Sequence, residues 1–73
     1  MGGISKASFF LIKNSEAISQ MLLSNRRSFT IKKDAYDMDI EDELVRLLLA
    51  MDGVEQAIPD EKGITIVKGG RIA

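Results

Sequence analysis

The chain contains no cysteine, no histidine and no tryptophan. Without cysteine it cannot form a disulfide, a thiolate nucleophile, a thiolate zinc site or a cysteine-ligated iron–sulfur cluster. The lack of histidine removes the commonest general base and metal ligand. These absences argue against an enzyme, and we expect no catalytic residue, no cofactor and no metal site.

Long hydrophobic runs are also missing. No apolar run reaches the roughly 18 residues that a membrane-spanning helix requires. The short apolar run near the N-terminus is closed by Lys13 and Glu16 without a cleavage-type ending, so we expect no signal peptide. We therefore predict a cytoplasmic protein that does not enter the membrane.

The overall composition is that of one small folded unit. Hydrophobic residues make up 45% and charged residues 29% of the 73 positions, as in globular rather than disordered chains. We predict a single domain over 1–73, with disordered ends at 1–5 and 70–73. A core of this size stabilises a chain only marginally, so self-association or a partner would help to stabilise it.

Charge is divided unequally between the two parts of the chain. Residues 1–33 contain six basic residues and a single acidic one, a net charge of +5. Residues 34–73 contain four basic and ten acidic residues, a net charge of −6. Such asymmetry can complement a second copy of the chain or guide a charged partner.

Residues 39–68 carry the most complete structural pattern. Asp39 is a suitable N-cap, and the acidic residues after it suit the positive end of a helix dipole. A broad helical stripe then follows, and Gly53 suits the left-handed residue that ends a helix. The stripe comprises Ile40, Leu44, Leu47, Leu48 and Met51, with Val45 and Leu49 at its margin. A helix of this kind is expected to lie on a sheet.

Two short strands are predicted after this helix, over residues 54–58 and 64–67. Pro59 and Gly63 bound the intervening turn, where proline presets φ and glycine accepts a positive φ. The two strands are therefore expected to pair in antiparallel fashion.

The first half of the chain predicts three further elements. The run Phe9-Phe10-Leu11-Ile12 indicates a strand over 7–12 with two apolar faces. Asn14 or Ser15 can cap a helix that ends near Asn25. Residues 28–33 alternate as a half-exposed strand. The predicted fold class is α+β, with one sheet of about four strands covered by two helices.

Two charged groups are candidate binding sites. The basic residues Arg26, Arg27, Lys32 and Lys33 could contact phosphates or a protein partner, with Phe29 between them as a stacking surface. The alternation of Phe29 with Ile31 favours a core position for its ring instead. The acidic residues Asp37, Asp39, Glu41 and Asp42 form a candidate partner surface. Part of this acidic run has the spacing of a calcium loop, but Asp42 and Leu48 stand where such a loop needs glycine and glutamate. The acidic run is therefore interpreted as a solvated helix start.

The segment 39–68 resembles the N-terminal domain of Nfu/NifU-type iron–sulfur scaffold proteins. The resemblance is carried by the spacing Leu44-x-x-x-Leu48, the pair Gly53-Val54 and the strand Ile64-Thr65-Ile66-Val67-Lys68. The cluster-binding cysteines of that family belong to another domain, and its polar, proline-containing opening segment is absent here. The resemblance therefore implies a fold, and it implies an accessory role in iron–sulfur cluster assembly.

Three functions follow as hypotheses. The first is a non-enzymatic protein-interaction or regulatory module that associates with itself, suggested by small size, segregated charge and the apolar run at 9–12. The second is nucleic-acid binding through the basic residues between 26 and 33. The third is the accessory role implied by the resemblance.

Overall fold

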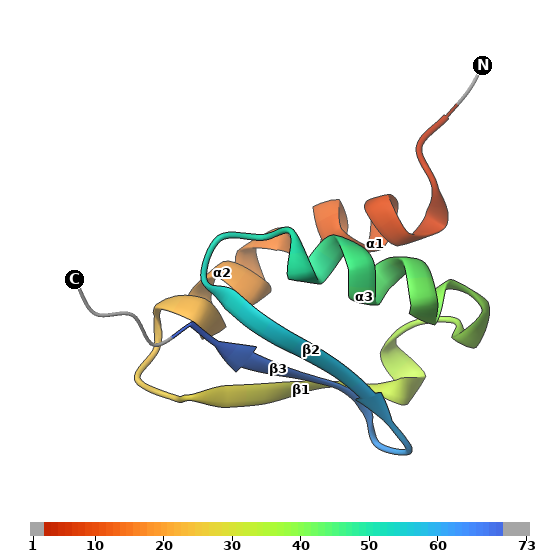
Figure 1. The fold of residues 1–73 in the computed structure, drawn as a ribbon. Helices are drawn as coiled ribbons and strands as arrows, with labels where there is room; N and C mark the ends of the chain where they lie inside the picture. The colour runs from red at the N-terminus through yellow and green to blue at the C-terminus, as the bar shows by residue number, and fades with distance from the viewer. Residues whose placement is uncertain (1–2, 70–73) are drawn as a thin grey trace.

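The computed structural model describes residues 3–69, which form one antiparallel sheet with helices on one of its faces (Figure 1). The α-helices are α1 (Lys6–Lys13), α2 (Ser15–Leu23) and α3 (Glu41–Leu49); the strands are β1 (Ser28–Lys32), β2 (Val54–Asp60) and β3 (Gly63–Lys68). Two 3-10 turns, η1 (Lys33–Ala35) and η2 (Met38–Ile40), join β1 to α3. The predicted α+β class is confirmed, but the four predicted strands are wrong, because the described part of the chain has three strands and three α-helices.

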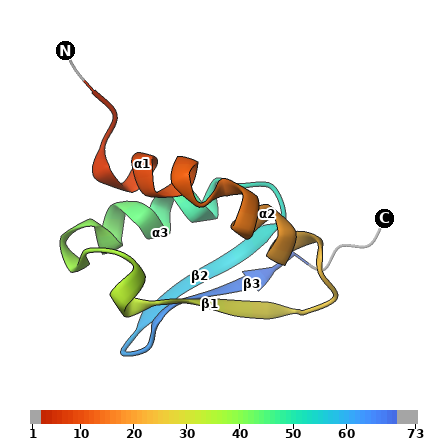
Figure 2. The same ribbon diagram turned by 180° about the vertical axis from the view of Figure 1, so that it is seen from behind.

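The sheet has the strand order β1-β3-β2, so β3 lies in the centre and is antiparallel to both neighbours. Alternate side chains of the strands point to opposite faces. Phe29, Ile66 and Ala57 lie opposite one another in the register and are buried under the helices. Thr30, Thr65 and Ile58 form the next row on the other face, which no helix of the described chain covers (Figures 1 and 2).

The β2–β3 hairpin is confirmed, and it is longer than predicted. Its strands continue through Pro59 and Gly63, so the turn contains only Glu61 and Lys62. The Asp60 carboxylate accepts hydrogen bonds from the backbone N–H groups of Lys62, at 2.8 Å, and Gly63, at 3.2 Å. Pro59 is tolerated because β2 is an edge strand, where one side of the backbone needs no partner.

The strand predicted over 7–12 is wrong, because these residues belong to the helix α1. The Ser5 hydroxyl accepts a hydrogen bond from the Ser8 N–H at 3.1 Å and caps the first turn. Ala7 is fully buried, and Phe10 and Leu11 pack against the core at helical spacing. The apolar run therefore supplies both sides of a helix, and a short run of this kind does not distinguish helix from strand by periodicity alone.

The second helix, α2, is confirmed close to its predicted position. Ile18 is buried in it, and Met21 and Leu22 pack against the core. Its end differs in detail, because Ser24 is the C-cap and no non-glycine residue of the described chain, Asn25 included, has a positive φ. Asn14 makes no side-chain cap for α2; its amide donates instead to the Phe10 carbonyl at 2.9 Å and closes α1.

The central helix, α3, is confirmed, but it begins two residues after the predicted cap. Asp39 lies in the turn η2, and the N-cap position is Ile40, which makes no side-chain cap. Three acidic residues still occupy the first turn, where the helix dipole favours them. The helix ends at Leu49 with Ala50 as C-cap, and Gly53 adopts a φ of 92° in the turn that leads to β2.

The core lies between the sheet and the helices, and α1 packs against α3. Its four largest fully buried side chains are Leu44, Leu48, Ile64 and Ile66. Among residues 3–69, no helix is both long and apolar enough to cross a membrane. Of the ends predicted to be disordered, residues 1–2 and 70–73 lie outside the described residues, whereas Ser5 is ordered as the cap of α1.

Candidate protein-binding surfaces

The outward side of α1 exposes large apolar side chains. Phe9 is 54% and Ile12 61% exposed, and Ile4, just before the helix, is 58% exposed. Because Ala7, Phe10 and Leu11 turn toward the core, the helical repeat of 3.6 residues directs Phe9 and Ile12 to the opposite side. We define Ile4, Phe9 and Ile12 as the α1 surface.

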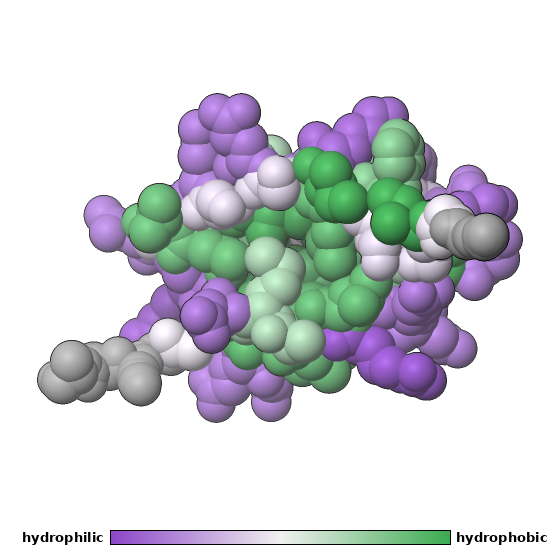
Figure 3. Space-filling model, turned by 90° about the horizontal axis from the view of Figure 1, so that it is seen from above, coloured by the Kyte–Doolittle hydropathy of each residue, from purple (hydrophilic) through white to green (hydrophobic). Residues whose placement is uncertain are grey.

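The neighbouring helix α3 exposes a further large apolar side chain. Leu49 of α3 is also exposed, at 46%, and α1 packs directly on α3. Figure 3, which views the molecule from above the helices, shows hydrophobic side chains gathered over this layer and hydrophilic ones around it. Scattered apolar residues are normal on a protein surface, whereas a gathered patch with a polar border is typical of an interaction site.

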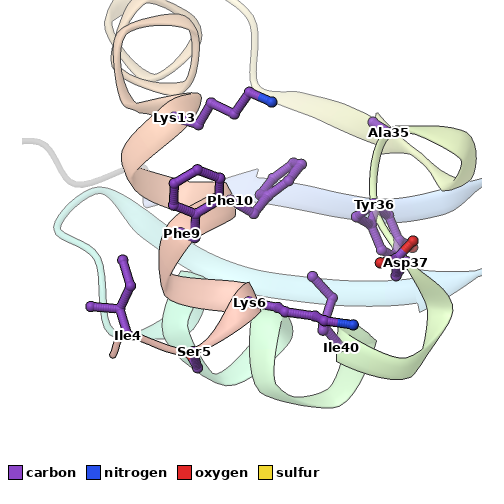
Figure 4. A pocket seen from close by; sticks show the side chains of 10 residues that line it. All are labelled: Ile4, Ser5, Lys6, Phe9, Phe10, Lys13, Ala35, Tyr36, Asp37 and Ile40. Atoms are coloured by element: carbon purple, nitrogen blue, oxygen red, sulfur yellow. The ribbon is translucent and has the colours of Figure 1, made fainter. Parts of the chain in front are cut away.

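A groove of about 470 Å³ lies beside the α1 surface, between α1 and the segment that joins β1 to α3 (Figure 4). Phe10 and Tyr36 meet at its base with ring centroids 6.3 Å apart and nearly perpendicular planes, an arrangement that aromatic pairs prefer. Lys13 Nζ lies 6.0 Å from the Phe9 ring centroid at one rim. The groove therefore adds apolar contact area next to Phe9.

The acidic residues predicted as a partner surface lie near the groove, at the start of α3. Asp37, Asp39 and Asp42 are exposed, whereas Glu41 is half-buried. Asp39 Oδ2 lies 3.8 Å from Lys6 Nζ, with both side chains more than two-thirds exposed, so the pair contributes little to stability. Among the described residues, no three acidic groups converge in a way that could hold a metal ion.

Glu41 has a structural partner. Its Oε2 atom accepts a hydrogen bond of 2.7 Å from the Tyr36 hydroxyl. Burial of Tyr36, aided by this hydrogen bond and the negative charges of Glu41 and Asp60, raises the pKa of the phenol from 10.0 to about 12. A phenol with this pKa stays protonated at neutral pH and cannot act as a general base.

The four predicted basic residues are not brought together into one site. Arg26 and Arg27 precede β1 and border a hollow with Lys68, whose Nζ donates to the Ser24 carbonyl. Lys32 and Lys33 lie at the other end of β1 beside Lys62. Lys32 lies five residue steps along the extended chain from Arg27, a distance of about 17 Å. The predicted basic site is thus two clusters, one at each end of β1.

Phe29 cannot serve as the stacking surface that a nucleic-acid site between these clusters would need, because it is 8% exposed and belongs to the core. Sequence reasoning also missed Phe9, Ile12 and Tyr36 as surface or groove residues. The spacing of Ala7, Phe10 and Leu11 contains the signal that places Phe9 and Ile12 outward.

Comparisons of this chain with protein-family models, with curated proteins and with solved structures find no match.

Proposed function

We propose that this chain is a non-enzymatic protein-interaction module that associates with a second copy through the α1 surface. The observation that carries the proposal is the exposure of Phe9 and Ile12, 54% and 61%, side by side on one helix. Burying a large apolar side chain contributes about 1.5–3 kcal/mol, so these positions would dominate the affinity of a small interface.

Charge near the α1 surface supports pairing between copies. Lys6 and Lys13 flank Phe9 along α1, whereas Asp37 and Asp42 are exposed across the groove and at the start of α3. A two-fold interface repeats each contact, so lysines of one copy facing acidic groups of the other would form two equivalent charged contacts. A chain with a small core also gains stability from an interface.

The test is molar mass by light scattering over a concentration series at low and high salt. We expect the mass to rise from 8.1 kDa toward twice that value as concentration increases. High salt should weaken the charged contacts and leave the apolar contact in place. A mass that stays at 8.1 kDa up to millimolar concentration, at both salt levels, would contradict the proposal.

A pair of variants locates the interface. Phe9→Gln combined with Ile12→Lys should weaken association at least about 100-fold. Each copy would lose two apolar side chains that become buried when the copies associate. Ile58→Gln is the matched control, since Ile58 is 45% exposed but lies on the uncovered face of the sheet. Circular dichroism should show that both proteins remain folded. Equal weakening by both variants would place the interface elsewhere.

A further inference from the structure

β1 has a free edge with unpaired backbone groups. The Arg27 carbonyl accepts from the Lys68 N–H, and the Lys33 N–H donates to the Lys62 carbonyl, each at 3.0 Å. In an antiparallel pair, the residues that bond to the neighbouring strand alternate with residues whose backbone groups point away. The N–H and C=O groups of Ser28, Thr30 and Lys32 therefore point outward, where no strand lies among residues 3–69.

The other edge of the sheet is blocked. By the same alternation, Pro59 is one of the residues of β2 that point away from β3, and proline has no N–H to donate. A register shift between Val54 and Gln56 further disturbs this edge. Such features prevent pairing with another strand. The difference between the two edges leaves β1 as the one that can accept an added strand.

A groove of about 370 Å³ lies beside this edge, between β1 and α2. Its walls are largely apolar, with Ile18 and Met21 from α2, Phe29 and Ile31 from β1, and Phe10 from α1. An edge strand beside a helix is a geometry that proteins use to bind peptides by strand addition. The main chain of the peptide pairs with the strand, and alternate side chains enter the groove.

The two ends of β1 are basic. Lys32 lines the groove itself, together with the acidic Asp34, and Lys33 follows it in the chain. Arg26 and Arg27 precede β1 and border a separate hollow. These charges disfavour a second copy of β1 as the occupant, because antiparallel pairing centred on Thr30 would set Arg27 opposite Lys33 of the other copy. Like charges directly opposite one another destabilise a strand pair.

We propose that the groove between β1 and α2 binds an extended peptide of a partner protein, with alternating apolar residues at its centre and acidic residues at both ends, as a fourth strand of the sheet. The unpaired backbone of Thr30 provides the pairing, the apolar groove takes alternate side chains, and the two basic clusters meet the acidic ends. This site lies away from the α1 surface and does not depend on self-association.

The test uses a fluorescent peptide, Asp-Glu-Val-Thr-Val-Asp-Glu, titrated with the full chain at about 50 and 200 mM salt. We expect saturable binding that weakens as salt increases. A peptide with lysine at all four acidic positions should bind at least about 10-fold more weakly, and so should one with proline as its central residue, because it cannot donate to β1. Equal binding of all three peptides, or no binding at low salt, would overturn the proposal.

Variants of the chain test the same contacts. Arg27→Glu with Lys32→Glu should weaken binding at least about 10-fold, whereas Lys6→Glu with Lys13→Glu, on α1, makes the same charge change and should leave the affinity unchanged. Thr30→Pro removes an outward N–H and should abolish binding. If Thr30→Pro does not fold, protection of the Thr30 and Lys32 amides from hydrogen exchange in the bound parent protein gives the same information.

Two further readouts separate this proposal from the alternatives. The Phe9→Gln/Ile12→Lys protein should bind the peptide as tightly as the parent protein does, because its groove between β1 and α2 is intact. Loss of peptide binding by this variant would overturn the proposed position of the peptide site. Labelled single-stranded and duplex DNA form the second comparison. Binding of DNA without binding of the acidic peptide would assign the basic clusters to nucleic acid and would also overturn the proposal.

Discussion

The Tyr36 hydroxyl donates a hydrogen bond of 2.7 Å to Glu41 Oε2, and this bond joins the segment after β1 to the first turn of α3. Tyr36 is buried, while Glu41 is half-buried, so the bond lies at the border of the core. Its ring also packs edge-on against Phe10 of α1. The Tyr36 side chain thus links α1 both to the segment between β1 and α3 and to the start of α3.

The first prediction concerns the titration of Tyr36. It is the only tyrosine of the chain, so tyrosinate absorbance reports on it alone, and we expect a midpoint near pH 12 rather than 10.0. Glu41→Gln should lower this pKa but keep it above 10.0, because burial remains the largest cause. Asp42→Asn is the control and should change the pKa little. A midpoint near 10.0 in the parent protein would contradict the buried hydrogen bond.

The raised pKa also predicts how stability depends on pH. The folded state holds the phenolic proton more tightly than the unfolded state, so the contribution is complete below pH 10 and is lost as pH rises toward about 12. We expect Tyr36→Phe to lack this part of the decrease in unfolding free energy at high pH, roughly 1–2 kcal/mol after allowance for solvent screening at the border of the core. Urea unfolding of both proteins across this pH range measures the difference. If the unfolding free energy falls with pH equally steeply in both proteins, Tyr36 makes no contribution to the decrease.

The second half of the fold was predictable because its signals are local and agree with one another. The stripe through Leu44 and Leu48 has helical period, and the hairpin has proline and glycine near its turn. The exact start of α3 was not predictable, because Asp37 and Asp39 are both good caps by residue type. The 3-10 turn places Ile40 at the N-cap instead.

The error over residues 7–12 has a physical cause. Four consecutive apolar residues satisfy both the pattern of a two-sided strand and that of a helix between core and surface. Ser5, which caps the helix, and the spacing of Ala7, Phe10 and Leu11 favour the helix. The error also hid the α1 surface, because alternation along a strand would place Phe9 and Ile12 on opposite faces. The outward backbone of Thr30 depends on strand order and was not predictable from sequence.

The second prediction compares two glycines with positive φ. A Cβ at Gly63, where φ is 142°, would lie 2.0 Å from the Ile31 carbonyl oxygen, so Gly63→Ala must displace the backbone of β1 or β3. We expect a loss of about 3 kcal/mol or more. At Gly53, with a φ of 92°, the nearest atom to a Cβ is Leu22 Cδ2 at 4.0 Å, so Gly53→Ala should cost only about 1–2 kcal/mol. Chemical denaturation measures both values, and a reversed order would contradict the close approach of β3 to β1 at Gly63.

The third prediction concerns two adjacent leucines of α3. Leu48 is fully buried, whereas Leu49 is 46% exposed. Leu48→Ala should cost about 2–5 kcal/mol, enough to unfold a domain of this size, because it leaves a cavity between α3 and the sheet. Leu49→Ala should cost less than about 1 kcal/mol. Thermal unfolding at a low protein concentration, where association does not contribute, checks both. Similar melting temperatures for the two variants would show that the helix faces the sheet differently.

The fourth prediction tests the cap of α1, on which the orientation of Phe9 and Ile12 depends. The Ser5 hydroxyl accepts from the Ser8 N–H at 3.1 Å, so Ser5→Ala should destabilise the helix by about 0.5–2 kcal/mol, and Ser5→Asp should retain the cap. Ser15→Ala is the control, because Ser15 is exposed in the first turn of α2 and α2 has no side-chain cap. Hydrogen exchange of the α1 amides should accelerate for Ser5→Ala alone. Fraying of the helix would also disorder the α1 surface, so Ser5→Ala should weaken self-association as well. Unchanged hydrogen exchange in α1 would contradict the assigned cap.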